Sequence, residues 1–222
     1  MTPDAIIFDF DGVIADSEIV SARIFSDFLT GIGLVCTPAD VHARYFGLNR
    51  QDQIASMRAE WADRVPADIA ERIAAHVDRA LDAPLAPIPG LAAFLARTGH
   101  LPRAIASSNA SAHIRTQLGH FGLAGHFGDH VYSGREHVTR GKPHPDLYLH
   151  AMAALGADPA RTLVVEDSPV GVRAAVAAGA RVVGLCAGSH CGADHGALLG
   201  GAGAHEIARD YAEIAELLRL AS

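Results

Sequence analysis

Short apolar runs recur along the chain, and each one ends abruptly at polar residues. Five runs of this kind are found, at residues 4–8, 103–107, 130–133, 162–166 and 181–185. Apolar runs of this length are typical of buried parallel strands. Between them apolar residues recur every four positions, as at Leu147, Ala151 and Leu155, which predicts helices. The alternation predicts an α/β fold with a doubly wound, Rossmann-like parallel sheet.

One long stretch, from Ser17 to Leu85, breaks the alternation because it contains no convincing strand. Its pattern predicts four consecutive helices, at Glu18–Thr30, Pro38–Tyr45, Arg50–Trp61 and Ala67–Leu81. A proline-rich linker follows at residues 84–90. We therefore expect a catalytic core of residues 1–16 and 87–222, with residues 17–86 forming a small all-helical domain. The Gly- and Ala-rich residues 187–204 are expected to be the least structured part.

Composition narrows the classes of partner. Half of the 222 residues are hydrophobic and the formal charge is −7, without a basic cluster, so nucleic acid is not an expected partner. No apolar run reaches membrane-spanning length, and no signal peptide is recognisable. Cys36, Cys186 and Cys191 are too few for a disulfide framework, so we expect free thiols in a cytoplasmic protein. We expect a monomer or a weak homodimer.

Two carboxylates follow the first apolar run, in the stretch Asp9-Phe10-Asp11-Gly12. Ligands of open α/β sheets bind beyond the carboxyl ends of the strands, so Asp9 and Asp11 are placed where a ligand is expected. They can face the same way because side chains alternate along extended backbone. One carboxylate can attack while the other moves a proton, and Gly12 permits a close turn. By itself, the stretch is more typical of a polar turn after a strand.

A second acidic pair, Glu166-Asp167, follows another apolar run. Two acids at the end of a buried strand are costly without a cation. Carboxylate oxygens beside a phosphate-bearing substrate favour Mg²⁺. The same stretch also predicts a helix start, with Asp167 or Ser168 as the cap and Pro169 at the first helical position. The two interpretations are compatible.

Hydroxyl, amide and ammonium groups occur at two further points. Ser107, Ser108 and Asn109 follow a third apolar run, where such groups suit a phosphate. Lys142 lies just before a predicted helix, and its compact charge can neutralise a phosphate and an attacking carboxylate. Each feature alone is more typical of an ordinary turn or a solvated loop.

Together and in this order, the four stretches resemble the haloacid dehalogenase superfamily, in the branch whose helical cap follows the first strand. The resemblance covers nearly the whole chain. It implies Asp9 as nucleophile, Asp11 as general acid and base, and Ser107 and Lys142 as holders of the phosphoryl group. It also implies Mg²⁺ on Asp9, the Asp11 backbone carbonyl and Asp167, with Glu166 close by. The implied activity is a phosphatase that acts on a small phosphorylated metabolite.

The resemblance also implies an aspartyl-phosphate on Asp9, and a cap that closes over the site and contacts the leaving group. Members of this branch include sugar-phosphate phosphatases and β-phosphoglucomutase. The mutase has a histidine where this chain has Ser21, and it has a cap lysine, whereas residues 17–85 contain none. The stretch around Arg50 does resemble the mutase, so Arg50 is a candidate contact for an anionic group of the substrate.

Two other interpretations have a basis in the sequence. A phosphoacceptor signalling domain also combines a nucleophilic Asp, an acidic pair, Lys and Mg²⁺, but its motifs come in a different order and it has no cap. A zinc site is suggested by the proximity in sequence of Cys186, His190, Cys191 and His195. Their spacing matches no paired-ligand pattern of structural zinc sites, so the sequence argues against one.

Overall fold

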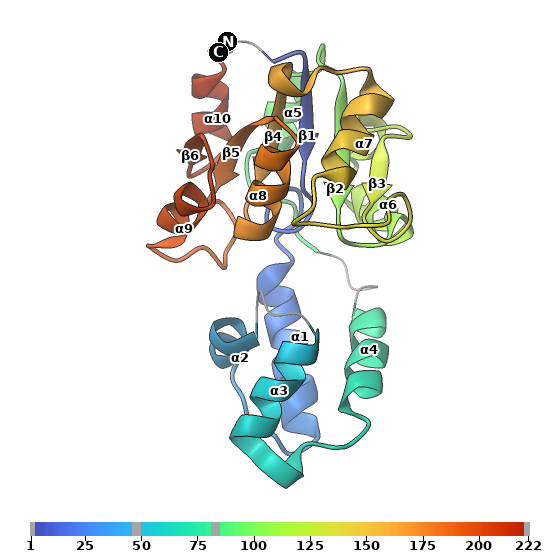
Figure 1. The fold of residues 1–222 in the computed structure, drawn as a ribbon, viewed down its shortest axis with the longest axis vertical. Coiled ribbons are helices and arrows are strands. Elements are labelled where there is room, and N and C mark those ends of the chain that lie inside the picture. The colour runs from blue at the N-terminus through green and yellow to red at the C-terminus, as the bar shows by residue number, and fades with distance from the viewer. Residues whose placement is uncertain (1–2, 46–49, 81–84, 220–222) are drawn as a thin grey trace. The chain divides into compact units, whose positions relative to one another are not determined.

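The computed structural model describes residues 3–45, 50–80 and 85–219 (Figure 1). The chain divides into two compact units. One comprises Met1–Asp16 together with Leu85–Ser222 and is called the core unit below. The other comprises Ser17–Pro84 and is called the helical unit.

The core unit is built on a six-stranded sheet in which all neighbouring strands are parallel. Its strands are β1 (Ala5–Phe8), β2 (Arg103–Ser107), β3 (Val131–Ser133), β4 (Thr162–Glu166), β5 (Arg181–Leu185) and β6 (Glu206–Ala208). The spatial order is β3-β2-β1-β4-β5-β6. The chain steps outward from β1 to β3 and then returns to the other side of β1. This topology confirms the predicted doubly wound sheet and places its switch point between β1 and β4.

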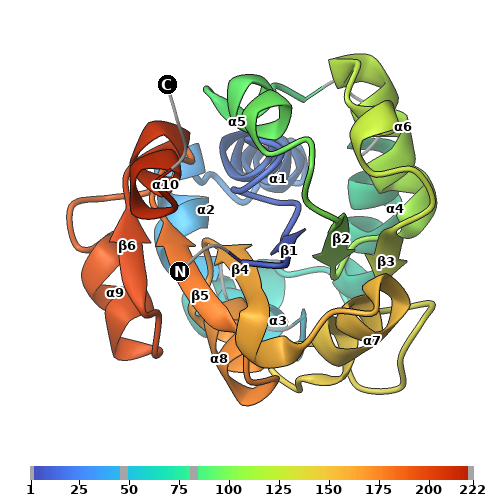
Figure 2. The ribbon, with the colours of Figure 1, turned by 90° about the horizontal axis from the view of Figure 1, so that it is seen from above.

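Six helices of the described chain cover the sheet, three on each face (Figure 2). Helices α5 (Leu91–Arg97), α6 (Ser111–Phe121) and α10 (Tyr211–Leu217) lie on one face, and α7 (Asp146–Leu155), α8 (Pro169–Ala177) and α9 (His195–Gly201) lie on the other. Ile6 and Phe8 of β1 pack with the first group and Ile7 with the second, as the alternation of side chains along a strand requires. Both faces of the sheet are therefore buried, which explains the apolar runs.

The five predicted strands are all present, and the sixth was missed. Strand β6 has three residues, of which only Ala208 is buried, so it gives no apolar run. The expectation that residues 187–204 are the least structured part was partly wrong, because α9 lies within this stretch. Its buried Leu199 packs under β5 and β6, beside Gly184 and Ile207. The helix was not predicted because its glycine- and alanine-rich sequence gives no apolar periodicity.

The helical unit contains α1 (Glu18–Gly31), α2 (Pro38–Tyr45), α3 (Arg50–Trp61) and α4 (Ile69–Ala80). They share a core of their own, to which each helix contributes a fully buried side chain: Leu29, Tyr45, Met57 and Ile73. The prediction of an all-helical insert after the first strand is confirmed. The predicted fourth helix extended to Leu81, which lies outside the described residues. None of the helices in the described part of the chain combines the length and apolar character that crossing a membrane needs.

Candidate active site

The carboxyl ends of the two central strands bring the predicted carboxylates together. Asp9 directly follows β1, and Glu166 is the last residue of β4, with Asp167 next. Phe8 pairs with Val165 in register, and the Asp9 amide donates to the Val165 carbonyl (3.0 Å). This edge of the sheet, at its switch point, is where ligands of doubly wound folds bind.

Lys142 enters this edge from the segment ahead of α7. Its Nζ donates to Asp9 Oδ1 at 2.8 Å and to Glu166 Oε1 at 2.6 Å. The lysine side chain is only 5% exposed, so both contacts are shielded from water. Burial alone lowers the pKa of Lys142, but Asp9 and Glu166 raise it well above the ordinary value. The ammonium is therefore held charged beside the Asp9 carboxylate.

Both carboxylate oxygens of Glu166 accept hydrogen bonds from other groups of the protein. Oε1 also accepts from the Tyr148 hydroxyl (2.7 Å), while Oε2 accepts from the Ser168 amide (3.0 Å) and hydroxyl (2.9 Å). Burial raises the pKa of Glu166, but Lys142 and these donors bring it below the ordinary value. A Cβ at Gly171 would lie 1.6 Å from Oε1, so only glycine fits there. Glu166 thus fixes Lys142 in place.

The helix start predicted in this stretch is also present. Ser168 is the N-cap of α8, because its hydroxyl accepts from the Gly171 amide (3.1 Å), and Pro169 is the first helical residue. The same serine donates to Glu166 and caps the helix. The acidic and capping interpretations therefore hold together.

Three buried carboxylates make this edge suitable for a hard cation. Ligand oxygens of Asp9, Glu166 and Asp167 all lie within 4.8 Å of one another. Burial raises the pKa of Asp9 well above the ordinary value, against the opposing effect of Lys142. The pKa of Asp167 is also raised well above its ordinary value, first by burial and then by the negative charge of Glu166. One ammonium cannot balance three carboxylates, and an all-oxygen donor set fits Mg²⁺.

Asp11 and the predicted phosphate-binding residues lie at the ends of β1 and β2. Asn109 Nδ2 donates to Asp11 Oδ2 at 2.7 Å, which orients that carboxylate. Ser107 is fully buried, and its Oγ accepts from the Asn109 amide (3.1 Å). Ser108 is exposed. Asp11, Ser107 and Asn109 therefore form one contiguous group.

Both the backbone conformation and the space around position 12 require a glycine there. Its φ of +66° lies in the left-handed region, and a Cβ there would sit 1.7 Å from Asp167 Oδ2. The turn after Asp11 therefore passes directly against the second acidic residue. This close approach joins the two acidic stretches into a single site.

Sequence reasoning did not anticipate the contacts made by residues 188–195. His190 Nε2 lies 3.2 Å from Asp167 Oδ2, and His195 Nε2 lies 2.7 Å from the Asp167 carbonyl oxygen. Ser189 donates from its amide (3.0 Å) and hydroxyl (2.7 Å) to Asp16 Oδ1. Burial lowers the pKa of both histidines, which favours neutral rings. The segment holds Asp167 by its side chain and its backbone.

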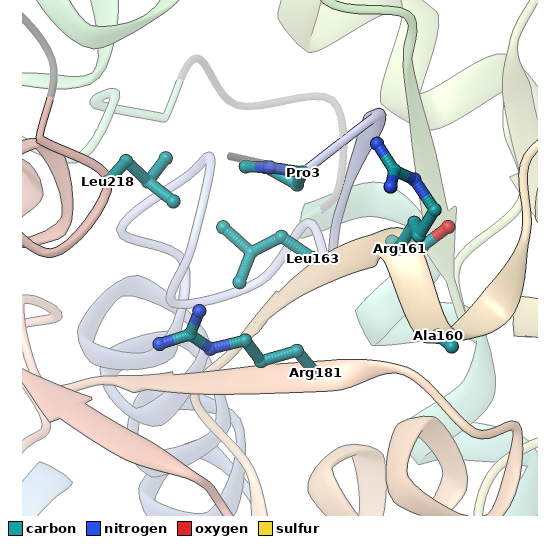
Figure 3. Close-up of a pocket in the computed structure, with 7 residues that line it drawn as sticks. Pro3, Ala160, Arg161, Leu163, Arg181 and Leu218 are labelled. Atoms are coloured by element: carbon teal, nitrogen blue, oxygen red, sulfur yellow. The ribbon is translucent and has the colours of Figure 1, made fainter. Parts of the chain in front are cut away.

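The remaining predicted residue, Arg50, begins α3. Its side chain lies outside the described residues, as does the preceding stretch 46–49, so the predicted contact with an anionic group stays a prediction. A small pocket of the core unit, shown in Figure 3, is lined by Leu163, Arg181 and Leu218 among others. It lies at the amino ends of β4 and β5 and is remote from the carboxylates at the opposite edge.

Known proteins resemble the chain over most of its length. A family model described as haloacid dehalogenase-like hydrolase matches residues 6–185. The 6-phosphogluconate phosphatase of Escherichia coli (strain K12) is 28% identical over 188 residues, 84% of each chain. Hexitol phosphatase A of that organism is 32% identical over 183 residues, 81% of each chain. A crystal structure of a HAD family hydrolase from Deinococcus radiodurans R1, with bound phosphate and sodium, has a TM-score of 0.84 at 32% identity. That match covers 97% of this chain and 95% of the other.

Proposed function

The chain belongs to the haloacid dehalogenase-like hydrolases, and we propose that it is a magnesium-dependent phosphatase that acts through an aspartyl-phosphate on Asp9. The observation that carries this proposal is the pairing of Lys142 Nζ with Asp9 Oδ1 at 2.8 Å, beside Asp167, at the switch point of the sheet. A buried carboxylate with a fixed ammonium at one side is suited to attack phosphorus. The lysine offsets the repulsion between the carboxylate and the anionic phosphoryl group.

In the first step an Asp9 oxygen attacks phosphorus in line and the bond from phosphorus to the leaving alkoxide oxygen breaks. Asp11, as the carboxylic acid, gives its proton to that alkoxide. In the second step the Asp11 carboxylate removes a proton from water as the water oxygen attacks phosphorus. The bond from phosphorus to Asp9 breaks and inorganic phosphate leaves. Asn109, which donates to Asp11, keeps the carboxyl group oriented in both steps.

Asp9, the Asp11 backbone carbonyl and Asp167 would hold the cation, with Glu166 engaged by Lys142, Tyr148 and Ser168 at its side. When bound, Mg²⁺ supplies positive charge to the phosphoryl oxygens. The protein's own contribution is to place the Lys142 ammonium beside Asp9, where it opposes the rise in the Asp9 pKa caused by burial, and to shield both groups from bulk water.

The proposed substrate is a sugar, polyol or sugar-acid phosphate. Two relatives named as phosphatases of 6-phosphogluconate and of hexitols support this class. Arg50 is the proposed contact for a second anionic group. A phosphomutase must delay attack by water, and in the mutase that this chain resembles a histidine helps to do so. Ser21 is exposed on α1 and cannot act as a base near neutral pH. Water, rather than a sugar hydroxyl, is therefore expected to attack the aspartyl-phosphate.

The proposal is tested by trapping the intermediate. The enzyme is mixed with a ³²P-labelled sugar phosphate and Mg²⁺, quenched in acid, and the label on the protein is challenged with hydroxylamine, which cleaves acyl phosphates. We expect hydroxylamine-labile label in the wild type and in the Asp4→Asn control, and none in Asp9→Asn. Asp11→Asn should slow release of the label, because the second step loses its base. Stable label in Asp9→Asn would show that the nucleophile is wrong.

A screen of phosphorylated sugars, polyols and sugar acids, with and without chelator, then defines the substrate and the cation. The mutase alternative is checked by phosphorus NMR, with glucose 1-phosphate and a trace of the bisphosphate. Accumulation of glucose 6-phosphate with little free phosphate would replace the phosphatase proposal by the mutase one.

A further inference from the structure

A cluster of soft donors lies beside Asp167, between the end of β5 and the first residue of α9. His190, Cys191 and His195 each place one ligand atom within 4.8 Å of the others. The three residues are partly buried, and the His190 side chain is only 7% exposed. The proposed phosphatase chemistry makes no use of the thiol or of the two imidazole rings.

Two of the donor spacings are close to those around a single tetrahedral cation. His190 Nε2 is 3.5 Å from Cys191 Sγ and 3.2 Å from Asp167 Oδ2. With zinc–sulfur bonds of about 2.3 Å and zinc–nitrogen or zinc–oxygen bonds of about 2.0–2.2 Å, neighbouring donors of a tetrahedral site lie about 3.3–3.7 Å apart. The two measured separations are therefore close to two edges of such a tetrahedron.

Hydrogen bonding alone accounts poorly for the position of His190. Nε2 carries either one proton or one lone pair, so it can make one strong bond, yet it faces both a thiol and a carboxylate oxygen. A cation among these atoms satisfies all three at once. Thiol and imidazole donors select zinc and similar ions, whereas magnesium is bound by oxygen donors.

The second histidine has one ring N–H engaged by a backbone carbonyl, as metal-binding histidines often do. His195 Nε2 lies 2.7 Å from the Asp167 carbonyl oxygen, which can only accept, so Nε2 carries the proton. In the neutral ring the lone pair is then on Nδ1. Histidines that bind metals typically donate their other ring N–H to a carbonyl or carboxylate. The rings of His190 and His195 meet edge to face, with centroids 5.1 Å apart.

We propose that His190, Cys191, His195 and Asp167 form a second cation site, selective for a borderline-soft divalent ion such as Zn²⁺. The sequence argued against zinc because four residues at an unfamiliar spacing were considered. The structure groups three of those four and puts Asp167 near them in place of Cys186. Because Asp167 also faces the magnesium site, an ion held by the soft donors withdraws a carboxylate from Mg²⁺. The binding is independent of the proposed function, whereas the inhibition that follows rests on it.

Cobalt is the probe for the binding. Metal-free full-length protein is titrated with Co²⁺ in excess Mg²⁺, and near-ultraviolet absorption is followed. We expect one equivalent to give a thiolate-to-cobalt charge-transfer band that Zn²⁺ removes. Cys191→Ser should abolish the band, and His195→Gln should weaken binding by about 10-fold or more. Cys186→Ser, in the same segment, is the matched control and should keep the band. Thermal melting confirms that each variant is folded.

The inhibition is measured separately, as phosphate release at fixed Mg²⁺. Added Zn²⁺ should inhibit, more Mg²⁺ should reverse the inhibition, and Cys191→Ser should be less sensitive to zinc. A wild-type protein that binds Co²⁺ without the band, or a band that survives Cys191→Ser, would overturn the proposed site. A cobalt band in a protein without phosphatase activity would support the site and refute the proposed function.

Discussion

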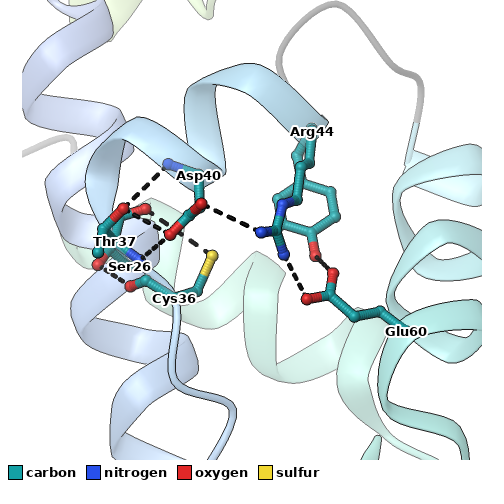
Figure 4. A network of polar contacts seen from close by, with 7 residues as sticks. Ser26, Cys36, Thr37, Asp40, Arg44 and Glu60 are labelled. Atoms are coloured by element: carbon teal, nitrogen blue, oxygen red, sulfur yellow. Dashed lines mark hydrogen bonds and ion pairs between the residues drawn. The ribbon is translucent and has the colours of Figure 1, made fainter.

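The core unit and the helical unit each contain a network of charged side chains, and the two differ in burial and in charge balance. In the helical unit, Thr37 and Asp40 bind each other reciprocally at the start of α2, as in a capping box (Figure 4). Arg44 links Asp40 to Glu60 of α3. The side chains of these ion pairs are 34–41% exposed, so water solvates each charge.

The network around Lys142 in the core unit is buried, and its excess of carboxylates over cations is larger. Its carboxylates, from Asp9, Glu166 and Asp167, are buried and outnumber the single ammonium. An exposed network stabilises its own helices locally and contributes little more. A buried one with excess charge costs stability until a cation arrives. The comparison supports the proposal that the core network serves chemistry at the expense of folding, whereas the helical-unit network serves folding.

The comparison is tested most severely by Asp9→Asn. Phosphate release should fall by about 10⁴-fold or more, because an amide does not attack phosphorus. The metal-free protein should nevertheless melt at a higher temperature than the wild type, since one excess buried charge is removed. Both are measured on the same preparation, by phosphate assay and by thermal melting in chelator. Asp4→Asn, in an exposed ion pair with Arg161, is the control and should remain active.

Removal of the central cation should have the next largest effect. Lys142→Met leaves Asp9 and Glu166 buried without their ammonium, so the free energy of unfolding should fall by about 3–5 kcal/mol. Turnover should fall by about 10²-fold or more. Urea unfolding compares it with Arg44→Met in the exposed network, which should lose much less stability. Equal losses for the two variants would remove the distinction between the networks.

A smaller effect is expected from filling the space beside Glu166. In Gly171→Ala the new Cβ would overlap the Glu166 carboxyl group, so Glu166 must leave the position in which it holds Lys142. We expect a destabilisation of about 1–3 kcal/mol with reduced turnover. Gly119→Ala is the matched control, because Gly119 lies in α6 with nothing near its added Cβ. That change should stabilise by about 0.5–1 kcal/mol.

The smallest effect belongs to the exposed network. Thr37→Ala removes the side-chain acceptor for the Asp40 amide at the start of α2, which should cost about 1 kcal/mol in unfolding experiments. The rate of turnover should be unchanged within about two-fold, because the loss is confined to the helix start. A large fall in turnover without unfolding would link this network to catalysis and contradict its purely structural role.

The sequence predicted the parts of the fold and site that depend on neighbours along the chain. Asp9 and Glu166 were recognisable because each stands where an apolar run ends, and the sheet topology then brings them together. A role for Lys142 could be predicted only from its order among the other motifs. Strand β6 could not be predicted, since its pairing with β5 is set by the path of the chain.

Contacts between distant side chains were not predictable from the pattern. Tyr148 has the spacing of a core residue on α7, and only the packing of that helix directs its hydroxyl to Glu166. In the sequence, His190 stood out only as part of a zinc pattern that its spacing argued against. Its contact with Asp167 depends on the course of the segment after β5, in which Ser189 binds Asp16.

The position of Lys142 has a practical consequence, because lysine occurs only once in the chain of 222 residues. Apart from the α-amino group, the Lys142 side chain is therefore the one amine that an acylating reagent can modify. That amine is shielded by burial and held protonated by Asp9 and Glu166, which raise its pKa well above the ordinary value against the effect of burial. Acylation needs the unprotonated, accessible amine, so it is expected only in molecules whose site has opened. The mass of the labelled protein thus reports directly on the opening of the site.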